Sequence, residues 1–168
     1  MPPGQLDWSP VLRAVLIALD DWVSHNRPPP PNTLMPLEGR PNDETVLPAP
    51  KYLPDAVIEV PRQDADGNVI GGVRLPDVEV PLGVHGIQNR PLSDRSCNLV
   101  AGYMVFSKTP ADRKPGDTRP SISERYKDRA DYVNRIRIST WRMIEQRFLL
   151  PEDGVVIIQA ATQSPAFD

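Results

Sequence analysis

The chain has 168 residues, a length that suits one domain with a sizeable hydrophobic core. Its net charge is −3 and its basic residues form no long run, which argues against a nucleic-acid partner. The single cysteine, Cys97, excludes an intrachain disulfide, and no stretch approaches the ~20 apolar residues of a membrane span.

Proline is unusually frequent, with 21 prolines against 10 glycines. Because proline fixes φ and removes a backbone donor, many stretches can be neither helix interior nor central strand. We therefore expect long ordered loops. The N-terminus lacks the basic and apolar regions of an export signal, so a cytoplasmic location is expected for the chain as given, whereas a longer parent protein could be exported.

The first predicted element is a helix over residues 9–25. Ser9 is expected to be its N-cap, and Pro10 suits the first helical position, where its missing N–H costs nothing. Apolar residues occupy nearly every face over residues 11–19, which predicts that other structure covers the helix on more than one side, as when a helix flanks a sheet. The prolines at 28–31 are expected to end it.

Residues 27–120 are predicted to form a proline-rich loop and hairpin region, in which residues 32–52 are a surface excursion. Three short, proline-bounded strands are expected, at residues 56–60, 69–75 and 78–80. The Asp-Ala-Asp-Gly-Asn turn at residues 64–68 favours a hairpin between the first two strands. Such short pieces fit sheet edges better than a central sheet.

The remainder, residues 121–168, is predicted to be helical. Ser121 and Glu124 have the spacing of a capping box, and a longer helix is expected over residues 128–148. Pro151 is expected to open another helix with acidic residues in its first turn. The buried stripe of the longer helix is expected to contain Val133, Ile136, Thr140, Ile144 and Phe148. The segments 1–26, 27–120 and 121–168 are expected to form one domain or part of one.

The sequence contains no recognisable complete catalytic site. None of the serines has the Gly-x-Ser-x-Gly surroundings of a hydrolase nucleophile, and the glycine loops that bind phosphates are missing. With only His25 and His85 and no close spacing of ligands, neither a metal nor another cofactor is predicted. The turn at 64–68 has its glycine in the wrong position for a calcium loop.

The polar, glycine-containing stretch at residues 83–90 is the best candidate for a pocket-lining loop. Its candidate residues are His85, Gln88, Asn89 and Arg90. A Cys97–His85–Asp94 arrangement would supply the thiol, base and carboxylate of a nucleophilic site. We favour the interpretation that His85 is a hydrogen-bonded loop histidine and Cys97 a buried small residue, while a substrate contact by His85 stays open.

The three tryptophans, Trp8, Trp22 and Trp141, could be a stacking set for a sugar or base. They lie at helix-compatible positions, however, and we expect core packing instead.

Several stretches occur in an order that is typical of one protein family. They are residues 6–14, 18–23, 28–31, 64–68, 72–76, 80–82, 119–126 and 147–153. In this order they resemble the C-terminal region of the bacterial α/β-hydrolase domain-containing proteins. The resemblance spans residues 6–161, and its specificity lies in the combined order, since no single stretch is a catalytic signature.

The resemblance implies a partial α/β-hydrolase fold, with late helices, short proline-bounded strands and long ordered loops. It implies an esterase-type protein in which the nucleophile and acid lie far upstream. The family's histidine is expected shortly before the segment matching residues 6–12. Residues 1–5 contain no histidine, so no catalytic residue is assigned, and whether this chain is itself an enzyme stays open.

The same resemblance implies partners. They are the upstream hydrolase half or a second copy bound through the 9–25 helix, and a small ester-like substrate in a complete enzyme. The alternative function is a non-catalytic interaction or structural module derived from the family, and a weaker third is a small thiol hydrolase that uses Cys97.

Overall fold

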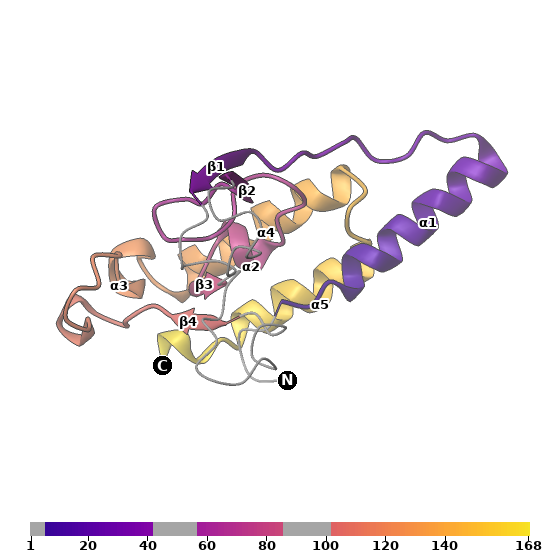
Figure 1. Cartoon of the computed structure of the whole chain (residues 1–168). Helices are drawn as coiled ribbons and strands as arrows, with labels where there is room; N and C mark the ends of the chain where they lie inside the picture. The colour runs from indigo at the N-terminus through magenta and orange to yellow at the C-terminus, as the bar shows by residue number, and fades with distance from the viewer. Residues whose placement is uncertain (1–5, 42–56, 86–101) are drawn as a thin grey trace.

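A computed structural model describes residues 6–41, 57–85 and 102–168 of the chain. Figure 1 shows a layer of helices near the C-terminus, a long first helix that reaches beyond it, and an extended segment that returns from that helix to a small sheet. The described residues form helices and short strands, a mixed α and β composition consistent with a partial α/β fold.

The first helix, α1, spans Ser9–His25 as predicted. Ser9 is its first residue and not its N-cap, which is Trp8, and the carboxylate of Asp7 accepts the Ser9 N–H at 2.9 Å. The helix ends at Asn26, which adopts a left-handed conformation with φ 53°. The proline run follows directly and the helix does not continue into it.

The strands differ from the prediction. β1, Leu37–Pro41, lies inside the predicted excursion and pairs antiparallel with β2, Val57–Pro61. The predicted strand at 69–75 is wrong, because only an isolated bridge between Gln63 and Val69 forms there. Gly71 and Gly72 both have positive φ, 77° and 65°, which turns the chain away from an extended path.

The predicted strand at 78–80 is also wrong. Its first two residues lie in a one-turn helix, α2, which spans Pro76–Glu79. Pro76 fixes a helical φ at the first position, and the amide of Val80 donates to the Pro76 carbonyl at 2.8 Å. The chain then forms β3, Gly83–His85, which pairs antiparallel with β4, Tyr103–Val105.

The C-terminal helices follow the prediction. α3 spans Ile122–Arg125, α4 spans Arg129–Glu145 and α5 spans Pro151–Thr162, while two short 3-10 turns span Pro110–Asp112 and Pro165–Phe167. The capping box before α3 is confirmed, since the Glu124 carboxylate accepts from the Ser121 amide at 2.8 Å. Asp128 caps α4 by accepting from the Asp131 amide at 2.8 Å.

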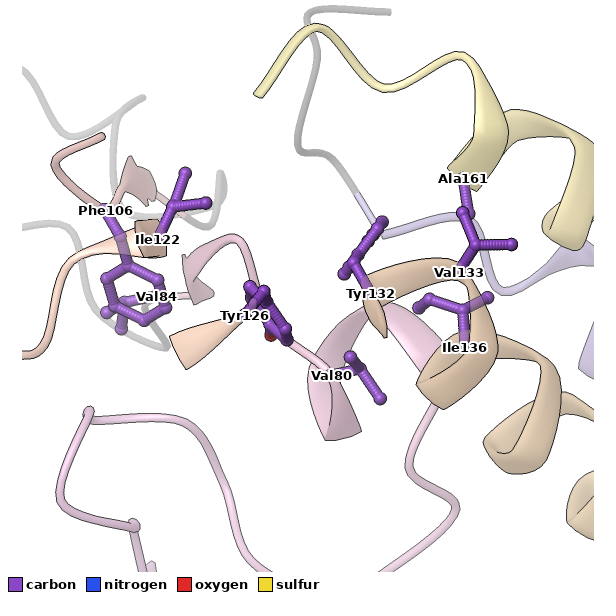
Figure 2. Close-up of a cluster of buried hydrophobic side chains, with 9 residues drawn as sticks. All are labelled: Val80, Val84, Phe106, Ile122, Tyr126, Tyr132, Val133, Ile136 and Ala161. Atoms are coloured by element: carbon purple, nitrogen blue, oxygen red, sulfur yellow. The ribbon is translucent and has the colours of Figure 1, made fainter. Parts of the chain in front are cut away.

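Two hydrophobic clusters form the core, and α4 contributes to both. The first, in Figure 2, contains Val80, Val84, Phe106, Ile122, Tyr126, Tyr132, Val133, Ile136 and Ala161. The second contains Val11, Leu75, Val78, Met143, Phe148 and Leu149. Val133, Ile136 and Thr140 of the predicted stripe are buried on α4, and Ile144 is partly buried, as the helical period indicated. Phe148 is also buried but lies beyond the end of α4, so the helix predicted over residues 128–148 is too long at its C-terminal end.

The tryptophans contradict the core-packing prediction. Trp8, Trp22 and Trp141 are 45%, 50% and 53% exposed. Trp22 lies outside the narrow buried face of α1, and Trp141 lies on the face of α4 opposite its buried stripe. The helical spacing of the tryptophans therefore predicted more burial of their side chains than the structure has.

Two isoleucines on α4 provide a matched test of the core. Ile136 is 0% exposed and Ile138 is 53% exposed. Ile136→Ala is expected to lower the free energy of unfolding by about 2–5 kcal/mol, because it removes buried methyl groups and leaves a cavity. Ile138→Ala is expected to change it by less than about 0.5 kcal/mol. Equilibrium urea unfolding measures both, and equal effects would contradict the assigned core.

The capping glutamate predicts an acid-sensitive contribution to stability. Hydrogen bonds from Arg113 and from Ser121 lower the pKa of Glu124 from 4.5 to about 2. A lowered folded-state pKa means that the stabilisation is complete above about pH 4.5 and is lost as the pH falls toward 2. The melting temperatures of wild type and Glu124→Gln should therefore differ at pH 7 and converge near pH 2. A pH-independent difference would refute this assignment.

Candidate functional site

The tight turn after β2 organises the candidate site. One carboxylate oxygen of Asp64 accepts from the amides of Asp66 and Asn68, each at 3.0 Å. Gly67 completes the turn with φ 98°, a conformation that glycine adopts without strain. The sequence-predicted turn is thus confirmed, although it does not lead into a regular hairpin.

Asn68 connects this turn to β3. Its side chain is 0% exposed and lies against the backbone of that strand. The side-chain oxygen accepts from the His85 amide at 2.8 Å, and the side-chain nitrogen donates to the Gly83 carbonyl at 3.3 Å. The side-chain amide of Asn68 therefore bonds to the backbone of β3 as a neighbouring strand would. β4 pairs with the same three residues of β3.

His85 is held at the end of this strand. Its ring lies 4.7 Å from the Tyr103 ring, centroid to centroid, at an interplanar angle of 41°. Gly83 permits the close pairing, because a Cβ there would lie 2.5 Å from the Met104 carbonyl oxygen. His85 lies in a strand and not in a loop as predicted, and the hydrogen bond from its backbone amide leaves the predicted role of its ring a hypothesis.

A polar hollow of about 350 Å³ lies beside the turn. It is lined by Asp64, Asp66, Arg74, Glu79, Val80, Pro81, Arg125, Tyr126 and Arg135. Three carboxylates and three guanidinium groups therefore face a common space, with a tyrosine and two apolar side chains beside them. Such a lining offers hydrogen-bond donors and acceptors of both signs to a polar molecule.

The carboxylates of the turn are paired with arginines. Arg125 forms a two-bond contact with Asp66, one bond being 2.8 Å, and both side chains are 15% exposed. The same guanidinium lies 4.0 Å above the Phe106 ring, a cation–π contact. Arg74 donates to Asp64 at 3.2 Å and to the Val78 carbonyl at 3.0 Å.

Glu79 is held by α4. The Ser139 hydroxyl donates to one of its oxygens at 2.9 Å, and Arg142 forms an ion pair with the other. Each carboxylate in the hollow thus accepts a hydrogen bond from a protein donor, and each is bonded to a different arginine, Arg74, Arg125 or Arg142. This arrangement is suited to holding the loops in place and does not present a carboxylate ready to act as a general base.

The phenol of Tyr126 stays protonated. Its hydroxyl donates to the Pro81 carbonyl at 2.8 Å, and burial raises the pKa of this phenol well above its usual value. In the part of the chain that the structure describes, the hollow is lined by no serine, cysteine or histidine that could serve as a nucleophile or base.

The remaining predicted site residues, Gln88, Asn89 and Arg90, lie outside the described residues, as do Asp94 and Cys97. The Cys97–His85–Asp94 arrangement therefore stays a hypothesis. Sequence reasoning missed the roles of Asn68 and Tyr103. The neighbouring residues of Asn68 predict only a turn. Its hydrogen bond with the amide of His85, 17 positions away, has no signal in the local sequence.

Residues 6–41, 57–85 and 102–168 include no group of three or more His, Cys, Asp or Glu side chains placed to hold a metal ion. Among the same residues, no helix is both long enough and apolar enough to cross a membrane.

Comparison with known proteins gives one match. Residues 1–159 match the family described as alpha/beta hydrolase domain. No curated protein and no solved structure matches the chain.

Asn68 provides a test of how the His85 strand is held. Asn68→Ala is expected to lower the free energy of unfolding by about 1–3 kcal/mol, because the mutation removes both hydrogen bonds of a fully buried amide. It should also shift the His85 amide resonance in an NMR spectrum. Asn134→Ala, on the exposed face of α4, is the control and should alter neither quantity appreciably. An unmoved His85 resonance in Asn68→Ala would contradict the proposed contact.

Proposed function

The chain belongs to the alpha/beta hydrolase domain family, and from this membership we propose that it is the C-terminal part of an esterase-type hydrolase. In this role it supplies scaffold and one wall of the substrate pocket. The catalytic serine, histidine and acid come from another segment. The substrate is a small ester.

The extent of the family match carries this proposal. It covers residues 1–159, almost the whole chain, yet no serine in the sequence has the small neighbours that a strand-to-helix nucleophile turn requires. A chain that matches a hydrolase family without that motif fits the role of a structural portion of the enzyme. Fold membership alone does not assign a reaction, so the activity itself must be tested.

The His85 strand is the proposed pocket wall. It is fixed from one side by β4 and from the other by Asn68, so side chains at its end have a defined position. Catalytic and binding groups work best when a rigid scaffold holds them, and loops that extend such strands commonly line pockets. Gln88, Asn89 and Arg90 follow His85 after Gly86 and Ile87 and are proposed to extend the same wall.

A non-catalytic interaction module is the second candidate. One observation favours it, namely that the three carboxylates of the hollow are already bonded to protein donors. The two candidates differ in whether the chain increases hydrolysis when it joins the rest of a hydrolase.

An ester hydrolysis assay tests the proposal. The purified chain is expected to give no hydrolysis of p-nitrophenyl acetate above the buffer rate, and His85→Ala and Cys97→Ser should give the same result. Co-expression with a hydrolase segment that supplies the serine, histidine and acid should produce activity that neither part has alone. Activity of the chain alone that His85→Ala or Cys97→Ser abolishes would overturn the proposal in favour of a thiol hydrolase. Failure of co-expression to produce activity would favour the interaction module.

A further inference from the structure

The segment that connects α1 to β1 is an extended stretch of chain held at its two ends. Near its start, the guanidinium of Arg147 donates to the Pro28 carbonyl at 2.6 Å. Near its other end, the amide of Gly72 donates to the Leu34 carbonyl at 3.1 Å. Figure 1 shows this segment running from the end of α1 back to β1. Both ends are therefore fixed to the folded chain.

Four consecutive prolines at residues 28–31, here called the proline run, determine the conformation between these anchors. A proline ring fixes φ at about −65°, and a residue that precedes a proline is restricted to an extended ψ. Pro28, Pro29 and Pro30 meet both conditions, so they adopt the polyproline II helix, which has no internal hydrogen bonds. In agreement with this, residues 26–36 form neither a helix nor a strand in the structure.

The proline run presents two of its edges to solvent. A polyproline II helix has about three residues per turn, so its side chains form three edges. Pro28 and Pro31 share one edge and are both exposed, and Pro29 is exposed on the second edge. Pro30 is partly buried on the third edge, and Thr33, three residues later, lines a hollow beside α4. The third edge therefore faces the body of the chain, and the other two are open.

The backbone of this segment keeps its hydrogen-bond acceptors free. Among residues 6–41, 57–85 and 102–168, no donor bonds to the carbonyl groups of residues 29–33. The side chain of Leu34 follows Pro31 at the spacing of one further turn and is 84% exposed. The segment thus offers a partner exposed proline rings, unused carbonyl oxygens and one large apolar side chain.

We propose that the exposed edge formed by Pro28 and Pro31, together with Leu34, is a docking surface for a protein module whose groove is lined by tryptophan and tyrosine rings. Such grooves bind preformed polyproline II segments by packing aromatic rings against the prolines. The indole N–H and the phenol O–H of the same rings can donate to the free carbonyls. Because both ends of the segment are anchored, binding orders little additional chain. The inference does not depend on the proposed ester chemistry.

The chemistry of the proline run disfavours other kinds of partner. Proline has no backbone N–H, so the run cannot add to the edge of a sheet as a strand. Arg27 directly precedes the run, but its guanidinium is already paired with Asp21 at 3.1 Å, so it adds little attraction for a negatively charged surface. A groove that reads ring shape and carbonyl oxygens matches what the run presents.

An SH3 domain and a WW domain are the binding probes, because both hold polyproline II ligands in a groove lined by aromatic rings. Each isotope-labelled domain is titrated with the full 168-residue chain. Contact with the proline run is expected to shift the indole N–H resonance of the groove tryptophan of at least one probe until the shift saturates. Light scattering of the chain alone measures whether a second copy covers the same surface.

Exposed prolines provide matched variants. Pro28→Ala combined with Pro31→Ala removes both rings of the exposed edge and should weaken binding about tenfold or more, because truncating central contacts dominates the loss of affinity. Pro115→Ala changes an exposed proline in a separate turn and should leave affinity within about twofold of wild type. Leu34→Ala keeps all four prolines and should also weaken binding. Circular dichroism and thermal melting check that every variant folds.

Three results would overturn the inference. The first is that neither probe shows a saturable shift. The second is that the double proline variant binds as tightly as wild type, which would place the contact elsewhere on the chain. The third is a dimer of the chain that the double proline variant disrupts, since a second copy would then cover the run. None of these results bears on ester hydrolysis, so the proposed function would stand or fall by its own assay.

Discussion

The buried face of α4 holds the described structure together, because side chains from this helix enter both hydrophobic clusters. Ile136 lies in the first cluster and Met143 in the second. Helix α5 packs closely across α4, and Gly154 permits this approach, since a Cβ there would lie 2.8 Å from the Ile144 Cδ1 atom. One helix thus fixes α5 directly and, through α5, the position of α1.

The segments between α1 and α3 are stabilised in a different way from the C-terminal helices. Among the residues that the structure describes, they have two sheets of two strands each, which are marginal units alone, and their many prolines cannot donate to a sheet ladder. Side chains replace the missing ladder, as Asn68 does along β3 and as Arg125 does at Asp66. Because the Arg125–Asp66 pair is largely buried and doubly bonded, removing one partner would cost far more than breaking an exposed ion pair. Arg125 and Asp66 both line the polar hollow.

The sequence predicted local features better than pairings. Helices α1, α3, α4 and α5 followed from capping residues, proline positions and the 3.6-residue period, which are all encoded within a few residues. The pairing of β2 with β1 did not follow from the sequence, because the alternation of residues in a strand does not specify which segment lies beside it. The alternation at 78–80 was misread as a strand, since Pro76 starts a helical turn in which Val78 is buried equally well. The placement of His85 beside Tyr103 depends on a pairing across 18 residues and had no local signal.

The exposure of Trp8 and Trp22 contradicts the prediction that their side chains pack in the core. Apolar residues on nearly every face predict a helix that is buried all round, and this physical expectation is sound even though Trp8 and Trp22 are half exposed. The described residues cover only the narrow side of α1, with small side chains such as Ala14 and Ala18. The large side chains face outward, so the apolar surface of α1 exceeds what the described residues bury.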